Sequence, residues 1–317
     1  MDRAPSDFTP KAHSSRAVGA VGWVGLGRMG SAMVSRLLDA GVEVDVFNRT
    51  PGKTEQFVTR GAKRLSTLAE VAQRDVVFSM VTDDEALSAI HDSQSGLFSH
   101  QPSRRLSVWI DGSTVSPGAA QRAATAARQA GVAFVSAPVS GNPSVVLGGN
   151  AVFVISGDES GLDVADHLVS LIGRAVSRAG TATEAVTIKL CVNALLAITM
   201  QSLAEITVLA DKAGVSRSSL LEFLNESAIG SPFTRYKTPN LVSLEFEPTF
   251  TAEGQRKDVR LALGLARDNE VPMPVLSATE EAYSRLIGSG LGVERDLSAL
   301  VLGTARDAGH VLRKDDR

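Results

Sequence analysis

The stretch VGWVGLGRMG, Val21 to Gly30, decides the fold of this chain. A short apolar run predicts a buried strand, and Gly25, Gly27 and Gly30 follow it with G-x-G-x-x-G spacing and a helix behind them. Gly25 permits a tight turn, Gly27 lets a pyrophosphate approach the backbone, and Gly30 lets strand and helix pack closely. The glycine spacing by itself is also compatible with a plain tight turn. Its place in a first strand–helix unit favours a dinucleotide-binding site. The expected contacts are Gly25, Leu26, Gly27, Arg28, Met29 and Gly30.

Outward from this motif, short apolar runs alternate with helical patterns up to about residue 178. This alternation is typical of a parallel sheet with helices on both faces. One helix ends at Ala40 before Gly41, and another, 117–130, begins after Ser116 as the N-cap. Residues 17–180 are therefore predicted to form a Rossmann-type, doubly wound α/β domain. Its expected strands are Val21–Val24, Val42–Phe47, Val76–Met80, Ser107–Ile110, Ala133–Ala137 and Ala151–Ser156.

After about Gly180 the pattern changes to long apolar helical stretches without a convincing strand. Residues 181–317 are predicted to form an all-α domain for substrate and subunit contacts, joined to the first by a long interdomain helix. That helix is apolar nearly all round, as expected of one packed between domains or subunits, so we expect a homodimer or homotetramer. The expected helices are 183–213, 218–226, 255–268 and 276–288.

Composition excludes several classes of protein. Thirty-two Lys plus Arg against 35 Asp plus Glu give a net charge of −3, so no global field favours nucleic acid or an anionic membrane. The single cysteine, Cys191, forms no internal disulfide, and five histidines show no metal-ligand spacing. These features predict a metal-free protein in a reducing cytoplasm.

Two segments resemble targeting or membrane signals only superficially. Residues 1–16 have no apolar run and are expected to be a mobile tail; Asp2 and Asp7 argue against a transit peptide. The apolar stretch from about 190 to 210 contains Asn193, Gln201 and Glu205, which favours a buried helix over a membrane span.

The end of the second predicted strand indicates which cofactor is bound. An acidic residue there would accept hydrogen bonds from a ribose 2′-hydroxyl, but the sequence reads Asn48, Arg49, Thr50 and then Lys53. These are the donors that a 2′-phosphate requires. NADPH is therefore favoured over NADH, and the alternative is that Arg49 and Lys53 belong to a solvated loop.

The long helix carries a candidate catalytic pair. Lys189 and Asn193 are four residues apart, so they share one helix face within apolar surroundings. Desolvation lowers the pKa of a lysine, which suits it to exchange a proton with a carbonyl or hydroxyl oxygen. Helix spacing alone equally permits a lysine that extends to solvent and an asparagine that caps a loop.

Several segments, taken in order, resemble the β-hydroxyacid dehydrogenases, the family of 3-hydroxyisobutyrate dehydrogenase and of tartronate semialdehyde, succinic semialdehyde and glyoxylate reductases. The resemblance covers about residues 18 to 303. The segments are GLGRMG, DGSTVSP at 111–117, APVSG at 137–141, the Lys189–Asn193 pair, the Lys257–Asp258 pair and the C-terminal VERDLSALV.

The resemblance implies roles for the catalytic and substrate-binding residues. Lys189 takes the position of the family's catalytic lysine and Asn193 that of its substrate-binding partner. Ser140 and Gly141 match the loop that binds the substrate carboxylate, and Ser113 matches the segment beside the nicotinamide and is expected to contact substrate.

The resemblance also implies further cofactor contacts. Val81 and Thr82 take the place of a Leu-Pro pair beside the ribose and nicotinamide, and Thr114 lies in the nicotinamide segment. Lys257 matches a lysine that closes over the cofactor. As alternatives, Ser113 and Thr114 belong to a helix cap and Lys257 to a solvated face.

The chain departs from the family pattern near the expected substrate. Ser136 replaces an aspartate, and Asn142-Pro143 follows Gly141 where a second glycine is common, which adds Asn142 to the candidate substrate contacts. Thr183 and Ala185 replace glycines before the catalytic lysine. These changes predict a substrate other than 3-hydroxyisobutyrate.

The leading hypothesis is an NADPH-dependent oxidoreductase that moves hydride between the nicotinamide and a short β-hydroxy acid or aldehyde acid, with Lys189 as general acid/base. One alternative is an imine reductase, although such enzymes generally lack the lysine. A second is a non-catalytic NADPH-binding protein. A phosphogluconate dehydrogenase would have a much larger helical domain.

Overall fold

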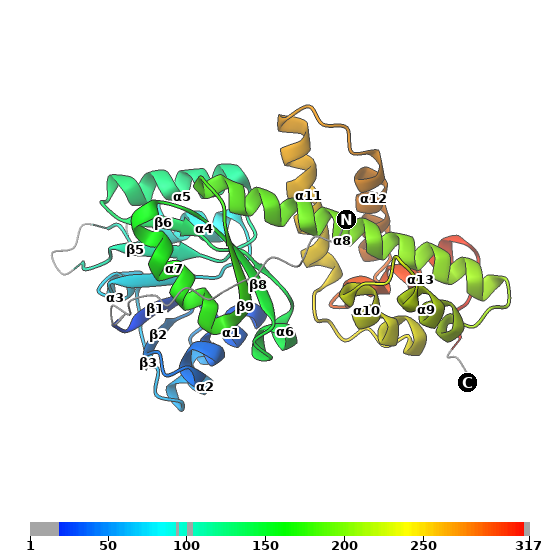
Figure 1. The fold of residues 1–317 in the computed structure, drawn as a ribbon, viewed down its shortest axis with the longest axis horizontal. Helices are drawn as coiled ribbons and strands as arrows, with labels where there is room; N and C mark the ends of the chain where they lie inside the picture. Colours follow the sequence, from blue (N-terminus) through cyan, green and yellow to red (C-terminus); the bar gives the residue numbers. More distant parts are fainter. Residues whose placement is uncertain (1–18, 93–94, 100–103, 314–317) are drawn as a thin grey trace, which may run out of the picture.

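The computed structural model describes residues 19–92, 95–99 and 104–313. The expected tail, 1–16, lies outside these residues. Figure 1 shows an α/β part and a helical part lying side by side, with helix α8 (Ala182–Lys212) running from the first along the second. The predicted fold class, a Rossmann-type doubly wound sheet followed by helices that begin with a long connecting one, is confirmed.

The α/β part is built on one mostly parallel sheet with the order β3-β2-β1-β4-β5-β6-β8-β7, and β9 pairs with β8. Pairings from β3 through β6 are parallel, whereas β8 pairs antiparallel with β6 and β7. The carboxyl ends of β1, β2, β4 and β5 therefore meet at one edge, where ligands bind in such sheets. The strands are β1 (Val21–Val24), β2 (Val44–Phe47), β3 (Lys63–Arg64), β4 (Val76–Ser79), β5 (Val108–Asp111), β6 (Ala133–Ser136), β7 (Val139–Ser140), β8 (Ala151–Gly157) and β9 (Gly173–Arg178).

Both faces of the sheet are buried because successive strand residues point to opposite sides. Trp23 and Phe78, which stack with ring centroids 4.5 Å apart, belong to the core on one face, and Val77 and Trp109 belong to the core on the other. The covering helices are α1 (Arg28–Asp39), η1 (Pro51–Thr54), α2 (Glu55–Val58), α3 (Leu68–Val71), α4 (Asp84–His91), α5 (Pro117–Gln129), α6 (Pro143–Leu147) and α7 (Glu159–Ile172).

The helical part has its own core around α8. Leu190, Met200 and Leu203 of α8 pack with buried residues of the later helices, among them Leu276 and Tyr283. The other helices are α9 (Arg217–Glu226), α10 (Pro232–Ser243), α11 (Ala252–Asp268), α12 (Pro274–Gly288), η2 (Leu297–Ala299) and α13 (Leu300–Asp307).

The start of α8 is fixed to the α/β part. Thr181 and Glu184 form a capping box, and the Ala185 N–H donates to the hydroxyl of Ser156 on β8 at 3.0 Å. Among the described residues, α8 is the one helix long and apolar enough to cross a membrane by length and composition alone. Its packing against α11 and α13 is that of a core helix.

Several details differ from the sequence expectations or add to them. Strand β2 begins at Val44 rather than Val42, because the Val42 N–H bonds to the Leu37 carbonyl at the end of α1. Helix α11 begins three residues earlier than expected, at Ala252, because the Thr251 side chain caps it. In the single chain, helix α8 also leaves an exposed apolar stripe of Ile188, Val192 and Leu195.

Candidate active site

The glycine-rich turn between β1 and α1 has room for a ligand at one position only. Gly25 has φ +99°, and an added Cβ would lie 2.2 Å from the Met80 carbonyl oxygen; a Cβ on Gly30 would lie 2.2 Å from the Gly25 carbonyl oxygen. A Cβ on Gly27, by contrast, meets nothing within 4 Å. Gly25 and Gly30 therefore hold the turn, and the open side at Gly27, beside the N–H groups that begin α1, fits a dinucleotide pyrophosphate.

The side chain of Asn48 ties this turn to the end of β2. Its Oδ1 accepts from the Leu26 N–H at 2.8 Å, and its Nδ2 donates to the Thr50 carbonyl at 2.9 Å. The Leu26 N–H is thus already used, and the Leu26 side chain is buried. Asn48 and the Leu26 N–H therefore support the turn from within the protein, and their contact with the cofactor stays a prediction.

The remaining residues predicted near the ribose differ in exposure. Arg49, Thr50 and Lys53 are exposed at the end of β2 and in η1, as a phosphate-binding set requires. Met29 is only partly buried and packs against the core. The exposed Arg28 donates to the Pro248 carbonyl at 2.5 Å, so it links the glycine-rich turn to the helical part.

Lys189 lies in a chain of hydrogen bonds between two helices. Its Nζ donates to Asn193 Oδ1 at 2.9 Å, and Asn193 Nδ2 donates to Asp258 Oδ2 of α11 at 2.6 Å. The Gln255 amide also donates to the Asn193 carbonyl at 2.9 Å. Burial lowers the pKa of Lys189 to about 8; the Asp258 carboxylate opposes this shift and the Lys257 charge adds to it. A lysine of this kind exchanges protons near neutral pH.

Asp258 is a site residue that the sequence reasoning missed. It is 2% exposed, and its second oxygen lies 3.0 Å from Lys257 Nζ. The sequence analysis singled out the Lys257–Asp258 pair but assigned a role only to the lysine. The available signal was a carboxylate on the apolar face of an amphipathic helix, where an ionised group needs partners.

Lys257 joins the helical part to two loops at the sheet edge. Its Nζ donates to the carbonyl oxygens of Thr82 at 2.9 Å and Thr114 at 2.6 Å. These loops follow β4 and β5, so Lys257, Thr82 and Thr114, which lie far apart in the sequence, are brought together at the expected nicotinamide end.

Ser113 does not present its hydroxyl to a ligand. It is fully buried, donates to Asp111 Oδ1 at 2.8 Å and accepts from the Val81 N–H at 2.9 Å. Ser79 also donates to Asp111 Oδ1, at 2.6 Å, and burial raises the pKa of Asp111 to about 6. The expected substrate contact through the Ser113 hydroxyl is therefore corrected: it holds the loops that carry Val81 and Thr114.

The substrate loop after β7 is strained at Gly141 and capped at Asn142. Ser140 and Gly141 are exposed; Gly141 has φ +143°, a conformation that favours glycine. Asn142 Oδ1 accepts from the Val145 N–H at 3.0 Å and Pro143 opens α6, so the unusual Asn-Pro pair begins a helix. The Oδ1 of Asn142 is thus used in the helix cap.

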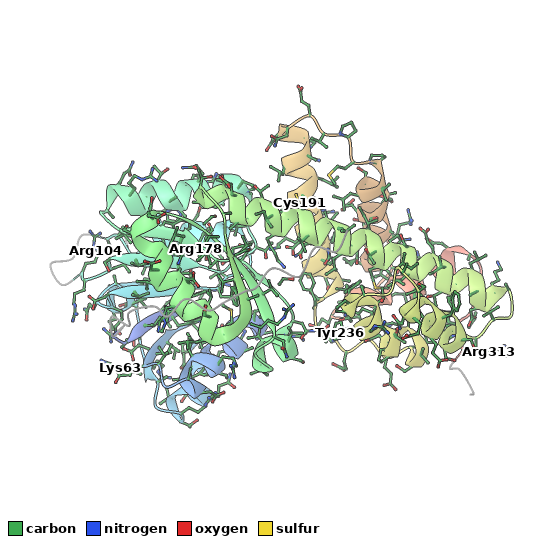
Figure 2. The ribbon with its side chains drawn as sticks, in the orientation of Figure 1. Lys63, Arg104, Arg178, Cys191, Tyr236 and Arg313 are labelled. Carbon is green, nitrogen blue, oxygen red and sulfur yellow. The ribbon has the colours of Figure 1, made fainter. Side chains whose placement is uncertain are left out.

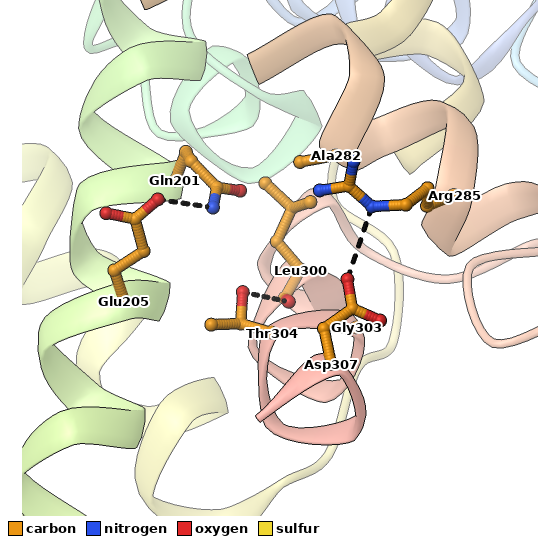
Figure 3. Close-up of a pocket in the computed structure, with 8 residues that line it drawn as sticks. All are labelled: Gln201, Glu205, Ala282, Arg285, Leu300, Gly303, Thr304 and Asp307. Atoms are coloured by element: carbon orange, nitrogen blue, oxygen red, sulfur yellow. Dashed lines mark hydrogen bonds and ion pairs between the residues drawn. The ribbon is translucent and has the colours of Figure 1, made fainter. Parts of the chain in front are cut away.

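A separate pocket lies on the helical part, away from these residues (Figure 3). It has a volume of about 180 Å³, and none of the predicted site residues lines it. Within the described ranges, no group of three or more His, Cys, Asp and Glu side chains gathers to hold a metal ion. The lining residues are Gln201, Glu205, Ala282, Arg285, Leu300, Gly303, Thr304 and Asp307.

A glycine-rich turn at the carboxyl edge of a parallel sheet, with a helical part that adds a bonded lysine, defines a two-part, dinucleotide-dependent oxidoreductase. Residues 20–182 match the family model of the NAD binding domain of 6-phosphogluconate dehydrogenase, and residues 183–302 match that of the NAD-binding domain of NADP-dependent 3-hydroxyisobutyrate dehydrogenase. The chain belongs to the β-hydroxyacid dehydrogenase family and is a dehydrogenase or reductase of that type.

Individual relatives agree with this assignment. The chain is 31% identical to glyoxylate/succinic semialdehyde reductase 2, chloroplastic, of Arabidopsis thaliana over 92% of this chain and 81% of the relative. It is 33% identical to glyoxylate/succinic semialdehyde reductase 1 of the same plant, over 89% and 96%. A solved structure of Mycobacterium tuberculosis 3-hydroxyisobutyrate dehydrogenase with L-serine has a TM-score of 0.79 at 25% identity, covering 90% of this chain and 98% of that chain.

Proposed function

We propose that this protein uses NADPH to reduce a short aldehyde acid to the hydroxy acid, with Lys189 as the proton donor. The observation that carries the proposal is the chain Lys189–Asn193–Asp258, with links of 2.9 and 2.6 Å. The partners of such a lysine fix its orientation, and burial brings its pKa near the pH at which it exchanges protons. A lysine that extends to solvent has neither property.

In the proposed reduction, Lys189, Asn193 and Asp258 each have a separate role. When bound, the nicotinamide supplies a hydride to the carbonyl carbon. The Lys189 ammonium gives a proton to the carbonyl oxygen, so a C–H and an O–H bond form while the C=O π bond breaks. Asn193 Oδ1 holds the ammonium, and Asp258, through Asn193, fixes the orientation of that amide. In the oxidation direction, neutral Lys189 takes the hydroxyl proton.

The preference for NADPH is supported by the end of β2. Arg49, Thr50 and Lys53 are exposed there, and no carboxylate stands at the position of a ribose-binding acid. Arg49 offers a fork of donors to a phosphate and Lys53 a point charge. Cells usually keep the NADPH pool reduced, which favours reduction of an aldehyde over oxidation of a hydroxy acid.

The choice of an aldehyde acid is supported by the substrate loop and the relatives. The two Arabidopsis relatives are named as reductases of glyoxylate and succinic semialdehyde. The α6 cap formed by Asn142-Pro143 departs from the common loop, in keeping with a substrate other than 3-hydroxyisobutyrate.

The test is consumption of NADPH, with NADH in parallel, on glyoxylate, succinic, tartronate and methylmalonate semialdehydes and a cyclic imine. We expect turnover of an aldehyde acid with NADPH favoured. Lys189→Met should lower kcat by at least about a hundredfold while NADPH binding, measured by fluorescence, stays within about twofold. Turnover of the imine alone, or NADPH binding without turnover, would contradict the proposal.

A further inference from the structure

The chain contains two tyrosines, and both have a buried hydroxyl oxygen without a hydrogen-bond partner among the described residues. Tyr283, on α12, is fully buried in the core of the helical part. Tyr236, on α10, lies where the helical part faces the α/β part (Figure 2). A buried hydroxyl without a hydrogen-bond partner lowers the stability of the fold. Because Tyr236 lies between the two parts, the geometry points to a ligand as its missing partner.

Two polar side chains, those of Thr249 and Asn142, lie near the Tyr236 hydroxyl. Burial raises the pKa of Tyr236, while Thr249 and Asn142 are near enough to offset part of the shift, so the phenol is protonated at neutral pH. The Thr249 hydroxyl is already occupied: it donates to Asp296 Oδ2 at 2.8 Å and accepts from Lys237 Nζ at 3.1 Å. The Thr249 hydrogen is thus used, and the Tyr236 hydroxyl makes no hydrogen bond to Thr249 among the described residues.

Asn142 is likewise committed through only one of its two polar atoms. Its Oδ1 accepts from the Val145 N–H, so the polar atom of Asn142 that is left for the Tyr236 side is Nδ2. The phenol and this amide therefore offer two neutral donors side by side, one from α10 and one from the loop that follows Ser140 and Gly141.

These donors lie on the same side of the molecule as the candidate active site. Pro248, next to Thr249, contacts Arg28 of the glycine-rich turn, and the chain then enters α11, which carries Asp258 to Asn193 and Lys189. Asn142 directly follows Ser140 and Gly141, so it belongs to the loop expected to meet the substrate carboxylate.

We infer that the Tyr236 hydroxyl, with Asn142 Nδ2 beside it, donates a hydrogen bond to the carboxylate of the aldehyde acid and so selects acids over plain aldehydes. This inference rests on the proposed function and adds a specificity-determining residue to it. Hydrogen bonds to an ionised acceptor are stronger than those between neutral groups, so two neutral donors discriminate without placing another charge in the site.

The test compares each acid with an aldehyde that lacks the carboxylate: succinic semialdehyde with butanal, and glyoxylate with acetaldehyde. Tyr236→Phe should lower kcat/KM for the acids by about tenfold to a hundredfold, mainly through KM, and leave kcat/KM for the plain aldehydes unchanged. Tyr283→Phe removes the same atom from the other buried tyrosine, so it is the matched control and should change neither value.

A second variant separates the donor from the helix cap. Asn142→Asp keeps an oxygen for the Val145 N–H but replaces the free donor by a negative charge, so KM for the acids should rise with the fold intact by circular dichroism. If Tyr236→Phe lowers kcat/KM equally for acids and plain aldehydes, or for neither, the inference is wrong while the proposed function stands. If the wild-type protein reduces no aldehyde acid at all, both fail together.

Discussion

At the scale of single residues, Lys189 makes the rate depend on pH in a defined direction. With its pKa lowered to about 8, the lysine is protonated below that pH and neutral above it. Because reduction consumes the lysine proton, we expect kcat/KM for reduction to be level below pH 8 and to fall about tenfold per unit above it. For oxidation of the hydroxy acid, which needs the neutral lysine, kcat/KM should instead rise with pH through the same pKa.

The control for this profile is Lys189→Arg, since a guanidinium stays protonated throughout. Any activity that it retains should show no fall between pH 8 and 10. A fall at the same pH in the arginine variant would assign the inflection to another group and remove Lys189 from the role of proton donor.

Asp111 makes stability depend on pH. Burial raises its pKa from 3.8 to about 6, so its contribution to folding is fully present below about pH 4 and is lost as pH rises through about 6. The loss amounts to about 3 kcal/mol. Asp111→Asn keeps an acceptor for Ser79 and Ser113 but does not ionise. Between pH 4 and pH 7.5, the free energy of unfolding of the variant relative to wild type, measured with urea, should rise by up to that amount. The same difference at both pH values would show that Asp111 ionises without this cost because water reaches it.

Most of the site residues predicted in the α/β part lie at the carboxyl edge of the sheet, but the sequence does not show which way their polar atoms point. The glycine spacing and the Lys189–Asn193 pair carry their geometry in the sequence, because turn and helix periodicity are local. Ser113 and Asn48 are hydroxyl and amide residues next to the expected ligand, yet both bond inward. One partner of each is distant in the sequence, Val81 for Ser113 and Leu26 for Asn48, and a local pattern does not report such a partner.

At the scale of elements, different glycines of the turn between β1 and α1 are expected to affect cofactor binding and stability. Gly27→Ala adds a methyl group into open space, so the free energy of unfolding should change by less than about 0.5 kcal/mol, while NADPH binds at least about tenfold more weakly. Gly30→Ala drives a Cβ against the Gly25 carbonyl and should cost about 1–3 kcal/mol of stability.

Both variants are measured by chemical unfolding and by titration with NADPH. Undiminished NADPH affinity in Gly27→Ala would show that the pyrophosphate does not pass over this turn. Because both variants add the same methyl group, a difference between Gly27→Ala and Gly30→Ala reports the position of that group and not its size.

The predicted elements agree with the structure where periodicity is strong. The strand Val21–Val24 and the ends of α8 and α9 fall within one residue of expectation. Helix α10 has no counterpart among the helices expected from the sequence. It contains Pro239 and has little difference between its faces, so it lacks the pattern that identifies a helix. A capping box between Ser231 and Thr234 holds it instead.

At the scale of the whole molecule, the exposed stripe on α8 bears on assembly. Ile188, Val192 and Leu195 are 44%, 47% and 65% exposed along one face of a helix that carries Lys189. We propose that a second copy of the chain covers this stripe in a homodimer or homotetramer. Light scattering after size exclusion should therefore give at least twice the monomer mass for the wild-type protein.

Leu195→Glu should shift that mass toward the monomer, because a charge in an apolar interface loses its hydration. Val58→Glu, which changes an exposed valine on α2, is the matched control and should leave the mass unchanged. A monomeric wild-type protein would contradict the proposal directly.

The continuity of α8 limits how the chain can change by insertion and deletion. The helix runs unbroken for 31 residues, and Lys189 lies near its anchored start while the helical core packs along the rest. One residue added after Asn193 would turn everything beyond it by about 100° around the helix axis and advance it by about 1.5 Å. Asp258 would then no longer meet Asn193. The length of this helix is therefore part of the geometry that joins Lys189, Asn193 and Asp258.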